Sequence, residues 1–110
     1  MQKITNLEHQ ANAFGFKWPK VSDVFDQIAS ECLEIQEVMD DPSKRLHLKE
    51  EVGDLISATL SLCVFLGFDP EDVLSENADK FEKRLKALFD LCRQEGIYSL
   101  KGADFETLMH

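Results

Sequence analysis

The stretch KEEVGDLISATLSLCVFLGF, residues 49–68, begins with charged residues and then turns almost wholly apolar. Its uncharged part, residues 55–68, is shorter than the roughly 20 residues that a membrane-spanning helix needs. We therefore expect the core helix of a globular protein. Glu51 and Asp54 stand at its charged end, three positions apart and so on one side of the helix. The fold must supply a partner for this charge, because a bare carboxylate is costly to bury.

The apolar part of this helix carries bulky side chains around nearly its whole circumference. A helix that is apolar on all sides must be covered on all sides. One bundle of 110 residues can hardly do this alone, because a chain of this length builds a single small core. We therefore expect a homo-oligomer, a homodimer or a homotetramer, in which a second copy of the chain covers the helix.

Prolines, glycines and aspartates divide the rest of the chain into helices, and no alternating strand pattern persists. Ser22 or Asp23 is expected to cap the second helix and Asp69 the last one. Gly67 and Gly96 are expected to end the last two long helices. The pattern predicts an all-α fold, arranged as an antiparallel helical bundle. The predicted helices span residues 3–14, 22–40, 43–66 and 70–93 of a single domain, residues 1–110.

The composition excludes several classes of partner. The net charge of −9 argues against binding to nucleic acid or to an anionic membrane, both of which require a basic surface. A phosphate ligand bridged by a metal ion is still compatible with this charge. The N-terminal residues MQKITNLEHQ lack the apolar region of a signal peptide. The three cysteines form no C-x-x-C pair and are expected to be small core residues of a cytoplasmic protein.

A second acidic pair, Glu31 and Glu34, lies on the preceding helix, again three positions apart. Antiparallel packing of the two helices would bring this pair close to Glu51 and Asp54. Two like charges about 5 Å apart repel by roughly 3 kcal/mol, even at an effective dielectric constant of 20. Four such groups would therefore either take up protons or bind a cation.

Neither acidic segment contains its own positive charge. Residues 21–43 hold seven acids and residues 50–79 hold eight, and neither range contains Lys or Arg. This disfavours the alternative of a solvated acidic face held by local ion pairs. A set of oxygen ligands favours Mg²⁺, Mn²⁺ or Ca²⁺. A ferritin-like di-iron site would use Glu-x-x-His pairs, which the sequence lacks.

Five further residues are candidates for substrate contact or for support of the acids. Asn77, Lys80 and Arg84 share one stripe of the last helix, which is either a solvated face paired with neighbouring acids or a set that meets phosphate oxygens. Trp18 either covers one end of the bundle or stacks on a nucleobase. His47, four residues before Glu51, is expected either to be a surface residue or to lie beside a metal ligand, rather than to be a ligand itself.

Several of these segments together resemble the MazG-type nucleotide pyrophosphohydrolases. The resemblance rests on Glu31-x-x-Glu34, on EEVGD with Glu51-x-x-Asp54, and on LGFDPEDVLSENADKFEKR at residues 66–84. The segment GFKWPKVSDVFDQIASECLEI, residues 15–35, is similar to the family's approach to its first metal-binding helix. An E-x-x-E pair alone is common on helices, whereas this ordered combination is specific. The resemblance covers about residues 14–92.

The resemblance implies an all-α enzyme that assembles as dimers or tetramers. It implies Mg²⁺-dependent cleavage of a nucleoside triphosphate between the α and β phosphates, and Mn²⁺ is expected to substitute for Mg²⁺. By position, the catalytic metal ligands would be Glu31, Glu34, Glu51 and Asp54. Lys80 and Arg84 would hold phosphates, and Asn77 would lie near the sugar or the base. Any of the four carboxylates, Glu34 among them, could take the proton of the attacking water.

Other functions remain open from the sequence. A sister activity within the same superfamily would be pyrophosphohydrolysis of dUTP or of phosphoribosyl-ATP, and the base pocket would distinguish these substrates. A different class would be a non-catalytic, metal-dependent nucleotide-binding or regulatory helical oligomer. A third would be a structural oligomer whose acids only keep it soluble, against which stands the lack of basic partners on the acidic stripes.

Overall fold

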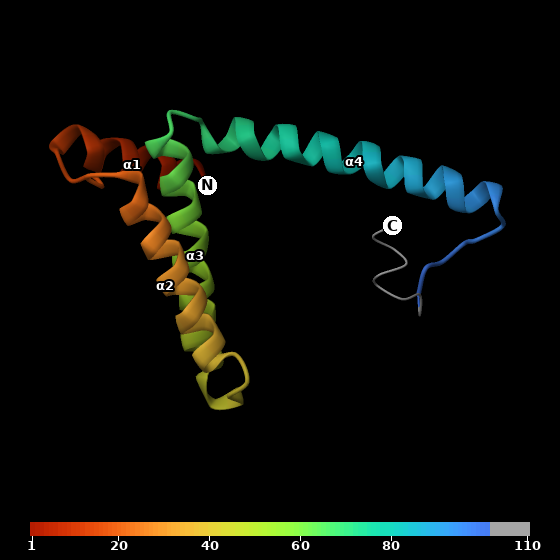
Figure 1. Cartoon of the computed structure of the whole chain (residues 1–110), viewed down its shortest axis with the longest axis horizontal. Coiled ribbons are helices and arrows are strands. Elements are labelled where there is room, and N and C mark those ends of the chain that lie inside the picture. Colours follow the sequence, from red (N-terminus) through yellow and green to blue (C-terminus); the bar gives the residue numbers. More distant parts are fainter. Residues whose placement is uncertain (102–110) are drawn as a thin grey trace. The chain divides into compact units, whose positions relative to one another are not determined.

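The computed structural model describes residues 1–101, and these residues form helices and no strand (Figure 1). The predicted all-α fold is therefore confirmed. By its internal contacts the chain divides into two compact units, residues 1–74 and the part that begins at Ser75. The single domain over residues 1–110 stays a prediction. The elements are α1 (Gln2–Phe14), α2 (Val21–Val38), the 3₁₀ helix η1 (Pro42–Lys44), α3 (Arg45–Phe65) and α4 (Pro70–Gln94).

The predicted ends of the last two long helices agree with the structure, whereas α3 begins at Arg45, two residues after the predicted start, because a 3₁₀ turn precedes it. Gly67 follows α3 with φ of 85°, and Gly96 follows α4 with φ of 73°, so both adopt the left-handed conformation that ends a helix. Pro70 is the first residue of α4. The Asp69 Oδ1 atom accepts a hydrogen bond from the Glu71 backbone N–H at 3.0 Å, which confirms the predicted cap.

The predicted cap of α2 is wrong. The helix already begins at Val21, and its N-cap is Lys20, in extended conformation and without a side-chain cap. The Lys20 carbonyl accepts a hydrogen bond from the Asp23 N–H at 3.1 Å, so Ser22 and Asp23 lie inside the first turn. Neither residue therefore occupies the N-cap position, from which a side chain accepts a hydrogen bond from the first free N–H groups of a helix. At the other end α2 stops at Val38, two residues earlier than predicted.

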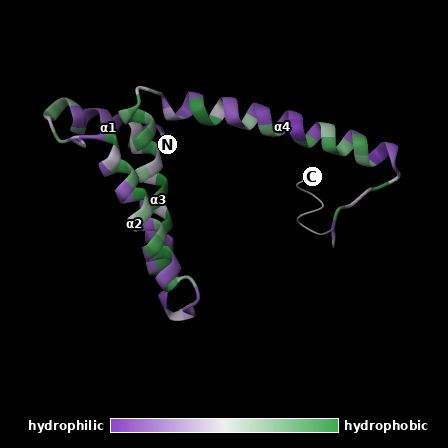
Figure 2. Cartoon of the chain, viewed as in Figure 1, coloured by the Kyte–Doolittle hydropathy of each residue, from purple (hydrophilic) through white to green (hydrophobic). Residues whose placement is uncertain are grey.

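The first unit is built around the pair α2–α3. The two helices run antiparallel and side by side, joined by η1, and α1 packs against α3 (Figure 1). The buried hydrophobic residues are Val24 and Val38 of α2 and Ala58 and Leu60 of α3. In the second unit, hydrophobic and hydrophilic residues alternate along α4 in the manner of an amphipathic helix (Figure 2).

All three cysteines are free thiols, but their expected core location is wrong for Cys32. Cys32 is exposed, whereas Cys63 and Cys92 are half-buried. Cys32 follows the buried Glu31 by one position and is therefore turned roughly 100° away from the face that meets α3.

The apolar helix predicted over residues 55–68 is covered only in part. Leu60 is 5% exposed, but Ile56 is 54% and Leu66 is 51% exposed. No single helix among residues 1–101 is long and apolar enough to cross a membrane. The ranges 42–65 and 70–94, taken together as a bent pair, meet the criterion on length and composition alone, which is weak support because buried core helices meet it too.

Candidate metal centre

Three carboxylates from two helices meet between α2 and α3. Glu31 of α2 and Glu51 and Asp54 of α3 each offer an oxygen atom, and these atoms all lie within 4.8 Å of one another. Glu31 stands seven residues from both Val24 and Val38, which are buried, and so it faces α3. The convergence expected from antiparallel packing is thus present for three of the four acids.

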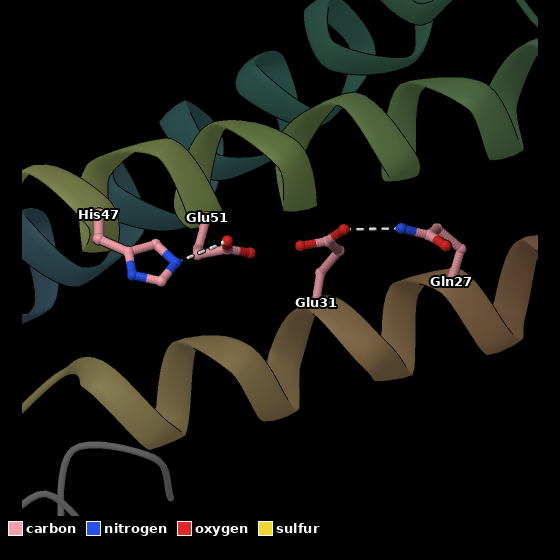
Figure 3. A network of polar contacts seen from close by, with 4 residues as sticks. All are labelled: Gln27, Glu31, His47 and Glu51. Carbon is pink, nitrogen blue, oxygen red and sulfur yellow. Dashed lines mark hydrogen bonds and ion pairs between the residues drawn. The ribbon is translucent and has the colours of Figure 1, made fainter.

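One oxygen of Glu31 and one of Glu51 are each held by a residue of the same helix. Gln27 Nε2 donates a hydrogen bond to Glu31 Oε1 at 2.6 Å. His47 Nε2 lies 3.1 Å from Glu51 Oε1, which agrees with the expectation that His47 supports a carboxylate. Figure 3 shows Glu31 and Glu51 pointing toward each other from the facing helices, with these two partners on either side.

The second oxygen of each acid has no partner. Glu31 Oε2 and Glu51 Oε2 are buried, and no hydrogen-bond donor reaches them in the part of the chain that the structure describes. Glu31 is only 6% exposed as a whole residue, and the Glu51 side chain is 12% exposed. Buried polar atoms without a partner are uncommon and costly. Two such anionic oxygens on facing helices fit a hard divalent cation, which accepts carboxylate ligands.

Glu34 lies outside this group of three and is exposed. It is nevertheless close enough to Glu51 for the two carboxyl groups to share a proton. This contact with Glu34, a similar contact with Glu31 and burial raise the pKa of Glu51 to about 7, and the hydrogen bond from His47 opposes the rise. Protonation of Glu51 at and below about pH 7 therefore removes one negative charge from the cluster.

No Lys or Arg neutralises these acids within residues 1–101. The ion pairs found there are His47 with Glu51, and two pairs on α4, Lys86 with Glu82 at 3.7 Å and Arg93 with Asp90 at 3.5 Å. The absence of local basic partners that the sequence indicated is confirmed for this part of the chain.

Asn77, Lys80 and Arg84 lie on α4 in the second unit, and all three are exposed. Neither Lys80 nor Arg84 has a carboxylate oxygen within 4.0 Å among the described residues. The ion pairs with neighbouring acids that the alternative of a solvated face requires are therefore not found for Lys80 and Arg84 among the described residues. Contact of these residues with phosphate stays a prediction.

Trp18 lies in the connector between α1 and α2, half-buried against a groove. The groove has a volume of about 450 Å³ and is mainly apolar, with walls from α1, from the connector and from Ser57 and Ser61 of α3. A neighbouring hollow of about 400 Å³ has Trp18 and Ser61 in common with it. A half-buried indole beside an open groove is compatible with stacking on a ligand ring.

The sequence alone did not single out Gln27, Glu8 or Ser61. Gln27 could have been found, because it stands four residues before Glu31 on the same side of α2. Glu8 and Ser61 carry no such signal. Ser61 Oγ donates a hydrogen bond to Glu8 Oε1 at 2.6 Å across 53 positions of sequence, which only the packing of α1 on α3 creates.

Comparison with known proteins matches residues 21–89 to the family described as the MazG nucleotide pyrophosphohydrolase domain. A nucleoside triphosphate pyrophosphohydrolase/pyrophosphatase MazG of Thermotoga maritima is 33% identical over 91 residues, which are 83% of this chain and 34% of that protein. A nucleoside triphosphate pyrophosphohydrolase of Escherichia coli is 29% identical over 112 aligned residues, covering 98% of this chain and 41% of that protein. The chain thus spans less than half the length of these curated relatives.

Proposed function

The chain belongs to the MazG nucleotide pyrophosphohydrolase family, and from this premise we propose that it hydrolyses a nucleoside triphosphate between the α and β phosphates. The products are a nucleoside monophosphate and pyrophosphate. The observation that carries the proposal is the meeting of Glu31, Glu51 and Asp54, with two buried oxygens that lack a partner. The names of the relatives, which describe the same class of activity, support it.

The cation of the proposed site is Mg²⁺, for which Mn²⁺ substitutes, because the donor set consists of carboxylate oxygens. Glu31, Glu51 and Asp54 would hold it, and Glu34 joins them through its contact with Glu51. A bound divalent ion supplies positive charge against the triphosphate and lowers the pKa of a water molecule.

Side chains of this protein carry out the proton transfer that accompanies hydrolysis. One of the four carboxylates accepts a proton from the attacking water. The oxygen atom of that water forms a bond to the α phosphorus. The bond from phosphorus to the bridging oxygen breaks, and that oxygen leaves with the pyrophosphate. Glu34 is suited to the proton transfer, because it is exposed and already close enough to exchange a proton with Glu51.

The substrate is held by residues outside the acidic cluster. Lys80 and Arg84 bind phosphate oxygens, and their lack of ion pairs in the described part of the chain leaves their donors available. Asn77 contacts the sugar or the base. Trp18 stacks on the base from its groove, which has a volume within the range of small-molecule sites.

The proposed enzyme is a homodimer or a homotetramer in the cytoplasm. The apolar residues of α3 that stay exposed in one copy, Ile56 and Leu66 among them, support the presence of a second copy. A triphosphate substrate and three free thiols are compatible with a reducing compartment.

A panel of ribo- and deoxyribonucleoside triphosphates, incubated with Mg²⁺, tests the function. We expect release of pyrophosphate and the matching monophosphate, and loss of both products on addition of EDTA or in the Glu51→Gln variant. Orthophosphate in place of pyrophosphate would refute cleavage between the α and β phosphates. Binding of nucleotide without any product would support the regulatory alternative.

A further inference from the structure

The groove beside Trp18 contains an acid that has no role in the metal centre. Glu8 of α1 lines the groove together with Trp18 and Asn12. We propose that this groove selects a nucleobase that carries an exocyclic amino group, with the Glu8 carboxylate as the acceptor that recognises it. The inference deepens the proposed function and rests on it, since it names the substrate class of the same enzyme.

The Glu8 side chain is held in place by a buried hydroxyl group. Ser61 is 7% exposed, and its Oγ donates a hydrogen bond of 2.6 Å to Glu8 Oε1. No donor from residues 1–101 reaches the other oxygen, Oε2, and no Lys, Arg or His nitrogen of this part of the chain lies within 4.0 Å of the carboxylate. The groove thus presents a fixed carboxylate that still has acceptor capacity.

An ionised carboxylate only accepts hydrogen bonds. Cytosine and adenine offer an amino group as donor at the edge where uracil and hypoxanthine carry a carbonyl oxygen. The amino bases would gain a charge-assisted hydrogen bond from Glu8, whereas the carbonyl bases would bring two acceptors together. The amide of Asn12 can donate to the ring nitrogen beside the amino group, which completes a two-point contact.

The groove also lies at a suitable position relative to the acids. Ser61 follows Asp54 by seven residues on α3 and so belongs to the same stripe of the helix. Seven residues correspond to about 10 Å along a helix axis. A nucleotide whose base lies beside Trp18 and Glu8 can therefore extend along this side of α3 toward the carboxylates.

Trp18 is the only tryptophan of the chain, so its fluorescence reports directly on the groove. The test titrates CMP against UMP, and AMP against IMP, without Mg²⁺. Within each pair the bases differ in carrying an amino or a carbonyl group at one edge. In each pair that binds, we expect the nucleotide with the amino group, CMP or AMP, to quench the fluorescence of Trp18. Its Kd should be at least about tenfold lower than that of UMP or IMP. Equal affinities, tighter binding of UMP or IMP, or no quenching by any of the four would overturn the inference.

Glu8→Gln and Ser61→Ala link the preference to these residues. Glu8→Gln removes the charge but keeps an oxygen that can accept the hydrogen bond from Ser61, and the ratio of the two Kd values within each pair should fall toward one. Ser61→Ala releases Glu8 and should weaken the preference less. Glu37→Gln, an equivalent loss of charge at an exposed position of α2, should leave it unchanged. An unchanged preference in Glu8→Gln would remove Glu8 from base recognition.

Pyrophosphate release separates this inference from the function on which it rests. If CMP is preferred to UMP and no triphosphate is cleaved, the groove is assigned correctly and the proposed activity is wrong. If CTP and UTP are cleaved with equal kcat/KM and bind equally, the activity holds and the role of Glu8 is wrong.

Discussion

Glu31 and Glu51 reach toward each other from antiparallel helices, and each is held through one oxygen by a residue four positions earlier. Gln27 bonds to Glu31 Oε1, and His47 contacts Glu51 Oε1. The two remaining oxygens are buried without a partner among the described residues. The same arrangement thus occurs on both helices and leaves one carboxylate oxygen from α2 and one from α3 in the gap between the two helices. Hydrogen bonding to Glu34, and to a lesser extent to Glu31, raises the pKa of Glu51 to about 7, and a cation in this gap would take the place of the proton that Glu51 binds.

Divalent metal is expected to stabilise the protein. A cation that binds only the folded state stabilises it by about 2.7 kcal/mol at a hundredfold excess over its Kd. For a domain of this size the melting temperature should rise by roughly 10 °C. Thermal unfolding with Mg²⁺, Mn²⁺ and EDTA measures this shift. The Glu51→Gln variant should lose most of it, and the same melting temperature in all three conditions for the natural chain would contradict a metal site.

Stability of the metal-free protein should depend on pH through Glu51. The pKa of Glu51 is about 7 in the folded state against an ordinary value of 4.5, so the folded state binds this proton more tightly. The resulting stabilisation is fully present below pH 4.5 and is lost as the pH rises through 7. In EDTA, the melting temperature of the natural chain should therefore fall across this window relative to that of Glu51→Gln. Parallel curves for the two proteins would show that Glu51 titrates normally.

Much of the metal centre follows from spacing alone. Glu31 lies seven residues from Val24 and from Val38, and Glu51 lies seven residues before Ala58, so the periodicity of the buried residues already directs these acids to the helix interface. The all-α fold and the ends at Gly67 and Gly96 follow from equally local signals. These features depend on residues that are close in the sequence.

Features that depend on distant contacts could not be predicted. The Glu8–Ser61 hydrogen bond joins residues 53 positions apart, and neither residue is unusual in its own helix. The cap of α2 was predicted wrongly because two good capping residues, Ser22 and Asp23, follow a lysine whose extended backbone starts the helix earlier. Cys32 was placed in the core because its neighbours are apolar, although it lies on the outer side of α2.

His47→Ala should weaken metal binding without removing a ligand. His47 contacts the Glu51 oxygen that is not free, and residues that orient metal ligands contribute typically 10- to 100-fold to affinity. Titration calorimetry with Mn²⁺ measures this affinity, and Gln27→Ala should show a loss of similar size through Glu31. His9→Ala, at an exposed position of α1, is the matched control and should bind Mn²⁺ like the natural chain. Unchanged affinity in His47→Ala would leave that residue without a role in positioning Glu51.

Self-association should depend on exposed apolar residues. Ile56 of α3 is 54% exposed and Phe81 of α4 is 64% exposed. Each would place a charge in an apolar contact if replaced by Glu, which disfavours association strongly. Light scattering at micromolar concentration should report a dimer or tetramer for the natural chain and a smaller species for Ile56→Glu or Phe81→Glu. A monomeric natural chain would contradict the proposed assembly.

Variants of the acids and of the bases should fail in different ways. Asp54 belongs to the proposed metal centre, and the metal acts on charge that develops in the transition state, so Asp54→Asn should lower kcat by about 10²–10³. Lys80→Ala should mainly raise KM if its phosphate contact already exists in the bound substrate. Arg84→Lys keeps the charge but loses the planar pair of donors, and it should still be impaired if Arg84 binds phosphate through two hydrogen bonds.

Lys86→Ala is the matched control for the basic variants. Lys86 lies on the same helix but is paired with Glu82 at 3.7 Å, and its side chain is 73% exposed. If only the overall positive charge of α4 mattered, Lys86→Ala and Lys80→Ala would raise KM to the same extent. The rise in KM would then disappear at high salt in both variants. A specific phosphate contact predicts a raised KM in Lys80→Ala alone, measured by steady-state kinetics with one good substrate at saturating Mg²⁺. If Lys80→Ala has the same kcat and KM as the unsubstituted chain, Lys80 is only a solvated residue of α4. If Asp54→Asn has an unchanged kcat, Asp54 has no role in catalysis.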